Sequence, residues 1–195
     1  MTFKPDETRY EFRQFGKDMT SVRDAFAKLD KGKAQPKSRE TYIVTRLNIE
    51  ANVKIRGAKL QVKTLEARLG VLEQWARPLN AEFPVGVQDI EMIVLPALGV
   101  DMELGEEGAF SEGVLLTVVE DQPSLAVQEV VKQRTLYEIG GCVAEFCKLS
   151  VGNETVHTIA VEATDAQAAL ALLAEIGLAD GENESYSEYL QRLLF

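Results

Sequence analysis

Residue-by-residue alternation of apolar and polar side chains dominates this chain, and it is the period of a strand with one buried face. It predicts strands in TRYEFRQF, TYIVTRL and NVKIRGAKLQVKTL. After Gly113 the pattern returns in GVLLTVVEDQ, VVKQRTLYEI, CVAEFCKLSV and TVHTIAVEAT. About eight strands joined by short turns favour an α+β fold built around a barrel or a strongly curved sheet.

Helical periodicity marks both ends of the chain. TSVRDAFAKL predicts a helix at residues 20–29. Near the C-terminus, Thr164 with Gln167 has capping-box spacing before AQAALALLAEI, and Ser185 with Glu188 repeats it before SEYLQRLL. We expect these helices to pack on the apolar faces of the strands.

The middle of the chain changes character. A stripe of Leu69, Leu72 and Trp75 predicts a helix in EARLGVLEQWARPLN, and QDIEMIVLPAL predicts a second one. DMELGEEGAFSEG is acidic and Gly-rich, which is typical of a loop. We therefore expect a single domain over residues 1–195, with a mainly helical insertion at about 67–112.

The stretch NVKIRGAKLQVKTL is a hairpin whose register the turn sets. Gly at the first of two loop positions suits a type II′ turn, which pairs Arg56 with Lys59 and Lys54 with Gln61. One face is then apolar, and the other carries the cations Lys54, Arg56, Lys59 and Lys63. A solvated sheet face is the plain alternative for this pattern.

The same parity gathers charged side chains on other strands. It places Arg9, Glu11 and Arg13 together, Lys132 with Arg134, Glu145 with Cys147, and Glu162 with Ala160. In a closed sheet these sides would converge on one interior. Buried cations need neutralising, so glutamates or an anionic phosphate chain are the expected partners.

Net charge narrows the choice of partners. A formal charge of −10 argues against nucleic-acid polymers and anionic membranes. The charge is uneven, since residues 1–66 hold 15 Lys or Arg against 9 Asp or Glu. An acidic protein can therefore still contain a local basic site.

Cysteine use and hydropathy suggest a location. Cys142 and Cys147 lie five residues apart, so in a strand they point to opposite faces and are poorly placed for a disulfide. The sequence has neither an apolar run of membrane-spanning length nor a signal-peptide core at its start. We expect a cytoplasmic protein with reduced thiols.

RYEFRQF, VKIRGAKLQVKTL, VVKQRTLYEIGGCVAEF, TIAVEATDAQAALALLAEIGL and SYSEYLQRLL, in this order, resemble a CYTH-domain protein. This is the triphosphate tunnel metalloenzyme group, with class IV adenylyl cyclases, thiamine triphosphatases and inorganic triphosphatases. The resemblance implies an eight-stranded antiparallel β-barrel or tunnel with helices packed outside. It also implies that the tunnel binds a triphosphate, with Mg²⁺ or Mn²⁺ held by glutamates. By position, it implies phosphate binding by Arg13, Lys54, Arg56, Lys63, Lys132 and Arg134, and metal binding by Glu11 and Glu162. Glu145 joins the metal set from strand parity alone.

Three departures from the family pattern affect its metal side. Arg9, Cys147 and Ala160 stand where the family has acidic residues. Hard cations require oxygen ligands, and Arg9 adds a positive charge beside the expected metal. The phosphate-binding half of the site is complete, and we assign no catalytic residue.

Three functions follow as alternatives. The first is a triphosphate- or polyphosphate-binding tunnel protein with divalent-metal triphosphatase (phosphohydrolase) activity, adenylyl cyclase being the lesser variant. The second is a non-catalytic anion- or nucleotide-binding protein that has lost its metal site. The third is a structural or interaction protein, in which salt bridges neutralise the charged face and the apolar helices at 68–98 form a homodimer interface.

Overall fold

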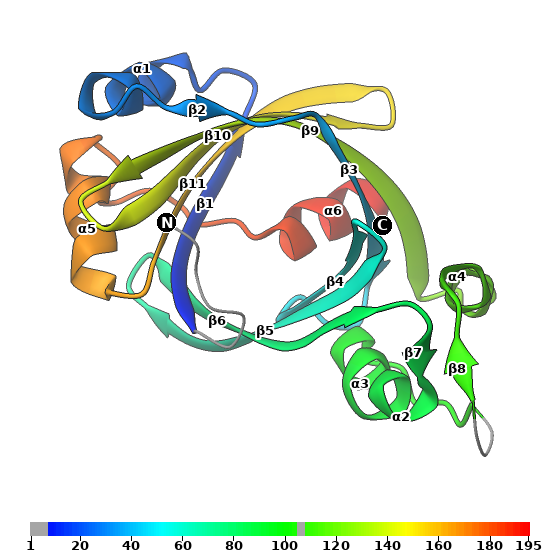
Figure 1. Ribbon diagram of the computed structural model, residues 1–195. Coiled ribbons are helices and arrows are strands. Elements are labelled where there is room, and N and C mark those ends of the chain that lie inside the picture. Colours follow the sequence, from blue (N-terminus) through cyan, green and yellow to red (C-terminus); the bar gives the residue numbers. More distant parts are fainter. Residues whose placement is uncertain (1–7, 105–107) are drawn as a thin grey trace. The chain divides into compact units, whose positions relative to one another are not determined.

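The computed structural model describes residues 8–104 and 108–195 and has an α+β fold (Figure 1). The long strands are β1 (Arg9–Gly16), β3 (Ser38–Thr45), β4 (Ala51–Arg56), β5 (Lys59–Leu69), β6 (Leu72–Glu82), β9 (Leu125–Ile139), β10 (Cys142–Val151) and β11 (Glu154–Ala163). The short strands are β2 (Lys33–Ala34), β7 (Val85–Gly86) and β8 (Ala109–Phe110). The helices are α1 (Thr20–Leu29), α2 (Val87–Asp89), the π-helical turn η1 (Ile90–Val94), α3 (Leu95–Leu98), α4 (Glu112–Glu120), α5 (Ala166–Glu175) and α6 (Tyr186–Leu194).

The strand order confirms the expected barrel. The main sheet runs β10-β11-β1-β6-β5-β4-β3-β9-β2, and an additional pairing of β10 with β9 closes its eight long strands. A closed sheet has no long exposed edge, which removes the usual template for edge-to-edge aggregation. No helix in the described ranges is long and apolar enough to cross a membrane.

The chain divides into two compact units, which are described separately below. Unit 1 comprises residues 1–39, 66–76 and 130–185, and unit 2 comprises residues 40–65, 77–129 and 186–195. Several strands contribute residues to both units, β5, β6 and β9 among them.

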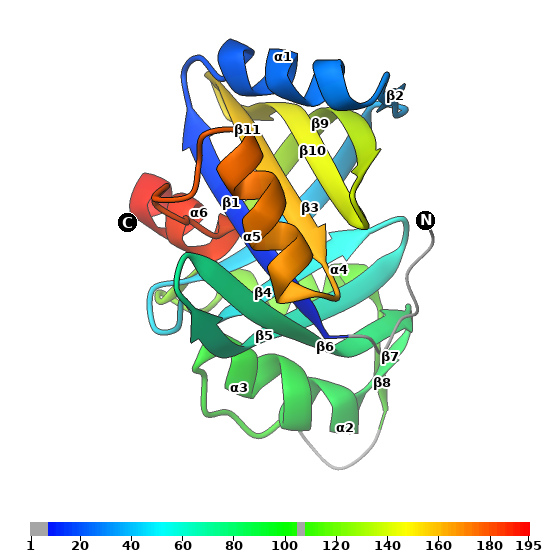
Figure 2. The ribbon, with the colours of Figure 1, turned by 90° about the vertical axis from the view of Figure 1, so that its left-hand side faces the viewer.

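Helices α1 and α5 bury the apolar face of the unit 1 strands (Figure 2). Phe12 of β1 and Val161 of β11 lie in one cluster with Leu173 of α5, and all three are fully buried. Phe26 of α1 packs against Tyr137 of β9, with ring centroids 5.3 Å apart. The alternation of the strands therefore leaves their other face for polar side chains.

A second core forms in unit 2 by the same logic. Val53 of β4 and Val62 of β5 pack with Val94 of η1, Leu98 of α3 and Leu115 of α4. The 3.6-residue period of QDIEMIVLPAL correctly predicts this helical segment. The second face of the β4–β5 hairpin is again polar.

Two segments differ from the sequence prediction. The helix expected in EARLGVLEQWARPLN is wrong, because residues 66–69 extend β5 and residues 72–80 belong to β6, with a two-residue turn at 70–71. A spacing of three between apolar residues suits a helical stripe, and here Gly70, at a φ of +60°, turns the chain into a hairpin instead.

The strand expected in GVLLTVVEDQ is also wrong, since this segment forms α4. Ser111 caps the helix by accepting a hydrogen bond from the Val114 amide at 3.3 Å. Leu115 and Val119, four residues apart, are both buried in the unit 2 core. A continuous run of Val and Leu does not distinguish a strand from a helix, and the packing decides.

One helix cap differs as well. Asp165, not Thr164, is the N-cap of α5, and its carboxylate accepts a hydrogen bond from the Gln167 amide at 2.9 Å. The C-terminal stop at Gly177 has a left-handed φ of +78°, as helix ends commonly do.

Candidate functional site

The β4–β5 hairpin of unit 2 has the predicted register. Lys54 pairs with Gln61, Arg56 with Lys59, and Asn52 with Lys63. The turn type is different, because Gly57 and Ala58 both have a φ of +59°. Two positive φ values define a type I′ turn, which keeps the same two-residue register as type II′.

A buried carboxylate lies under the hairpin cations. Glu40 of β3 has a fully buried side chain, 3.0 Å from Lys54 Nζ through Oε2 and 3.6 Å from Arg56 Nη1 through Oε1. The Tyr42 hydroxyl donates to Glu40 Oε2 at 3.0 Å. Together these residues form the unit 2 cluster, in which one carboxylate bridges two cations.

Glu40 is absent from the predicted site. The predicted strand began at Thr41, one residue too late to include it. Tyr42 pairs with Lys54 across the sheet, so two-residue parity from Tyr42 would have placed Glu40 on the charged face.

The other hairpin lysines are less enclosed. Lys63 is half-buried opposite Asn52. Lys59 forms a 3.1 Å ion pair with Glu82, whose side chain is 76% exposed. An ion pair of this kind contributes little to stability.

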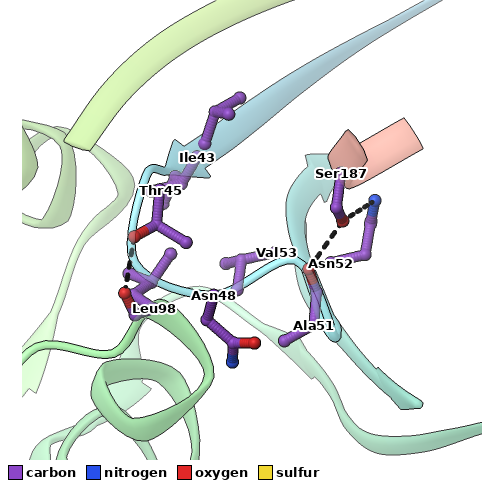
Figure 3. A pocket seen from close by; sticks show the side chains of 9 residues that line it. Ile43, Thr45, Asn48, Ala51, Asn52, Val53, Leu98 and Ser187 are labelled. Atoms are coloured by element: carbon purple, nitrogen blue, oxygen red, sulfur yellow. Dashed lines mark hydrogen bonds between the residues drawn. The ribbon is translucent and has the colours of Figure 1, made fainter. Parts of the chain in front are cut away.

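Figure 3 shows a small pocket in unit 2 next to this hairpin, between β3, β4, α3 and α6. Ser187 of α6 donates to the Ala51 carbonyl at 2.6 Å, and the Thr45 hydroxyl donates to the Leu98 carbonyl at 2.7 Å. The pocket leaves about 10 Å³ for the centre of a water molecule. That is room for roughly one water, so this pocket is no site for a larger ligand.

In unit 1 the strand register gathers the predicted charged residues on one face. Arg13 pairs with Ala160, which pairs with Glu145 on the far side. Two residues further along β10, Cys147 pairs with Arg134 of β9 on one side and with Thr158 of β11 on the other. Lys132, two residues from Arg134 on β9, shares this face.

Arg13 and Arg134 flank Glu145, Lys132 lies on the same strand face, and these four residues form the unit 1 cluster. Arg13 Nη1 donates to Glu145 Oε1 at 3.2 Å and to the Thr158 hydroxyl at 2.8 Å. Arg134 Nη1 lies 3.8 Å from the other oxygen, Glu145 Oε2. Arg13 is 9% exposed and Lys132 only 4%, so two of the three cations are buried.

The backbone of Arg13 is tied to the end of unit 1. β1 pairs with β6 from Arg9 to Glu11. Beyond that point the Arg13 amide donates to Asn183 Oδ1 at 2.7 Å, and its carbonyl accepts from the Glu184 amide at 2.8 Å. These bonds fix the strand from which the Arg13 side chain extends.

A row of three glutamates crosses unit 1 beside the cluster. Glu11 of β1 pairs with Glu162 of β11 on one side and with Glu73 of β6 on the other. Directly opposed like charges are destabilising, and arginines compensate them. Arg9 Nη1 lies 3.2 Å from Glu162 Oε2, and Arg68 Nε lies 3.6 Å from Glu73 Oε1.

Glu73 is a further residue that the sequence prediction missed. It is 7% exposed and also accepts a hydrogen bond from Trp75 Nε1 at 3.2 Å. The wrong helix in this segment hid it, because its alternation with Trp75 becomes visible once the segment is a strand.

The predicted metal ligands do not form one site in this arrangement. Glu11 and Glu162 are neighbours, whereas both oxygens of Glu145 face arginines. Across the described ranges, no group of three or more His, Cys, Asp or Glu side chains is arranged to hold a metal ion. The geometry around Glu145 and Glu162 fits guanidinium groups better than Mg²⁺ or Mn²⁺, whose binding here stays a prediction.

Cys147 lies on the same face as the unit 1 cluster, yet it is chemically quiet. Burial, reinforced by the charge of Glu145, raises the pKa of its thiol to about 12, although three nearby cations oppose the shift. A protonated thiol is a poor nucleophile. Both cysteines are free and buried, as their spacing predicts.

Comparison with known proteins identifies the fold. No protein-family model matches the chain, and no curated protein matches its sequence. A candidate adenylate cyclase from Bacillus halodurans superposes with a TM-score of 0.52 at 11% identity, covering 97% of this chain and all of that one.

Two archaeal structures are similarly related. A conserved hypothetical protein from Pyrococcus furiosus gives a TM-score of 0.52 at 12% identity over 92% of this chain and 98% of that one. The PH1012 protein from Pyrococcus horikoshii gives 0.51 at 11% identity over 90% and 94%. These likenesses confirm the fold that the CYTH resemblance implies, an eight-stranded antiparallel barrel.

Proposed function

We propose that this protein binds a small triphosphate or linear polyphosphate, with the cations of the unit 1 cluster as one phosphate-binding set. The cations of the unit 2 cluster, together with Lys63, form a second set, which we consider separately. The observation that carries the proposal is the unit 1 cluster, in which Arg13 and Arg134 share the carboxylate of Glu145 and Lys132 lies on the same strand face. Arg13 and Lys132 are buried. Burying positive charge is costly, and a bound polyanion would offset that cost.

The cation types suit phosphate oxygens. The planar guanidinium groups of Arg13, Arg134 and Arg56 can each bind two oxygens at once, while Lys132 and Lys54 provide point charges. Thr158 holds Arg13 through a hydrogen bond, which lowers the entropy lost when a ligand binds. The resemblance to the triphosphate tunnel group supports the same ligand class.

Substitution in the unit 1 cluster tests the proposal. We expect tripolyphosphate to raise the melting temperature of the wild type, and Lys132→Met with Arg134→Met to weaken binding at least about 100-fold, since two charge-assisted contacts are lost. Calorimetric titration at low salt measures the affinity. Lys148→Met is the matched control, because Lys148 is an exposed lysine of β10 in the same unit.

A control variant that loses as much affinity as the double variant would contradict the assignment. If no phosphate changes the melting temperature of the wild type, the structural or interaction role is the alternative that still stands. In that role the salt bridges would neutralise the charged face.

A second candidate, a metal-dependent triphosphatase, is favoured by the glutamate row. A divalent cation bound by the two neighbouring carboxylates of Glu11 and Glu162 would relieve the repulsion between them, with water supplying its remaining ligands. Phosphate release from tripolyphosphate or ATP in the presence of Mg²⁺ or Mn²⁺ would support it. Because the similar Bacillus structure is described as a candidate adenylate cyclase, the same assay with ATP should also measure the formation of cyclic AMP.

A further inference from the structure

Each unit contains the same unusual arrangement, a carboxylate bridging two cations on the charged face. In unit 2, Glu40 bridges Lys54 and Arg56 at 3.0 and 3.6 Å. In unit 1, Glu145 bridges Arg13 and Arg134 at 3.2 and 3.8 Å. The two carboxylates come from different strands, β3 and β10, so the repetition is not a consequence of local sequence.

The cations lie closer to solvent than the carboxylate in unit 2. The Glu40 side chain is 0% exposed, that of Lys54 is 14% and that of Arg56 is 38% exposed. An anion arriving from solvent would therefore meet the two cations first, with Glu40 behind them. Tyr42 holds Glu40 there by its 3.0 Å hydrogen bond, and its ring stacks on Tyr186 of α6 at 5.3 Å.

We propose that Glu40 and Glu145 are built-in counter-anions that limit the phosphate affinity of this protein and grade it by ligand charge. The inference rests on the proposed function and specifies its regulation. Each carboxylate places one negative charge beside two cations, and this charge repels the ligand when it binds. Such repulsion is Coulombic, so it grows with the charge of the ligand.

The proposal is tested by a substitution that removes the negative charge of Glu40 and changes its shape little. Glu40→Gln keeps the length of the side chain and an oxygen that can accept from Tyr42 and Lys54, but removes the negative charge. At low salt we expect tripolyphosphate to bind about tenfold more tightly or better, with smaller gains for pyrophosphate and smaller still for orthophosphate. The gain should shrink as salt rises.

The ion pair of Lys59 and Glu82 provides a matched control. Glu82→Gln removes the same charge from a pair joined at 3.1 Å near the same hairpin, but Glu82 is exposed and screened by water. We expect its phosphate affinity to match the wild type within about twofold. A gain in this variant equal to that of Glu40→Gln would show an effect of net charge alone and overturn the proposal.

Two further variants keep the test decisive if Glu40→Gln does not fold. Glu145→Gln repeats the experiment in the other unit. Glu40→Gln combined with Lys54→Met removes both members of a buried pair, which proteins tolerate better than the loss of one. This double variant should bind tripolyphosphate more tightly than Lys54→Met alone.

The results separate the inference from the function. If the wild type binds tripolyphosphate and the Gln variants bind it no more tightly, the carboxylates only position the cations. That result would contradict their proposed role as counter-anions. If neither the wild type nor any variant binds phosphate, the proposed function falls as well. Binding by the Gln variants alone supports both, since the internal anions then mask the site.

Discussion

At the scale of single residues, the thiol of Cys147 shows how burial outweighs nearby charge. Lys132, Arg13 and Arg134 all favour a thiolate, yet burial and Glu145 raise the pKa to about 12. Desolvation disfavours the charged form whatever its sign, and in this position it dominates. Cys147 is therefore a small packing group on a charged face.

We predict that neither cysteine of the folded protein reacts with iodoacetamide at pH 8, because burial raises the pKa of both thiols. Mass spectrometry should find no label on the native chain and two labels after denaturation. A single label on the native protein would contradict the burial of one site.

The raised pKa of Cys147 makes the free energy of unfolding depend on pH. The folded pKa of Cys147 exceeds the ordinary value of 9.0, so its contribution to stability is complete below pH 9 and is lost as the pH rises toward 12. Unfolding releases a proton in that window, and the free energy of unfolding should fall there. Cys147→Ala should show a smaller fall in denaturant titrations.

At the scale of elements, the β4–β5 turn contains a strained residue. Ala58 has a φ of +59°, a region that side chains with a Cβ rarely adopt. We predict that Ala58→Gly raises the free energy of unfolding by about 0.5–1 kcal/mol, because glycine adopts this backbone without the clash. Chemical denaturation measures the difference.

Gly57 is the matched control for that turn. A Cβ at Gly57 would meet no atom within 4 Å, so Gly57→Ala tests backbone strain alone and should destabilise by a similar amount. If both substitutions changed the free energy of unfolding in the same direction, the strain argument would be contradicted.

Elements also show where a sequence pattern suffices. In the β4–β5 hairpin, alternation and turn length predicted the register, and the pairs agree residue by residue. In β9, β10 and β11, alternation predicted which side chains share a face, but the pairing between these strands had to come from the structure. Alternation succeeds because each strand has one face under a helix. It could not identify Glu73 or α4, where a spacing of three or an unbroken apolar run suits both structures and tertiary packing decides.

At the scale of the whole molecule, the alternating segments predicted about eight strands, but the count included residues 113–122, most of which form α4, and omitted β6. Closure of the sheet was what the family resemblance implied, and the strand order confirms it. The pairings of Glu40 with Lys54 and of Arg13 with Glu145 were not predicted, because a salt bridge depends on side-chain geometry across strands. Arg13 and Glu145 are 132 residues apart in sequence. The sequence shows which charged residues share a face of a strand. Their salt-bridge partners on other strands follow only from the register in the structure.

A long-range bond offers a test at this scale. Asn183→Ala removes the acceptor of the Arg13 amide, 170 residues away, and should lower the free energy of unfolding by about 1–3 kcal/mol, because a partly buried donor loses its bond. Tripolyphosphate affinity should fall too if the strand that supports Arg13 shifts. Asn153→Ala, in the exposed turn after β10, should change neither quantity.

The hydrogen bonds between the Arg13 backbone and residues 183–184 have a consequence for folding during synthesis on the ribosome. β1 precedes the other long strands in the chain, but its partner β11 follows much later, and Asn183, which binds the Arg13 amide, lies 170 residues after it. While the chain is being made, β1 therefore stays unpaired on that side until residues 154–184 have been synthesised. Contacts so distant in sequence make for slow folding, so the interval after translation is when this chain most needs protection from its neighbours.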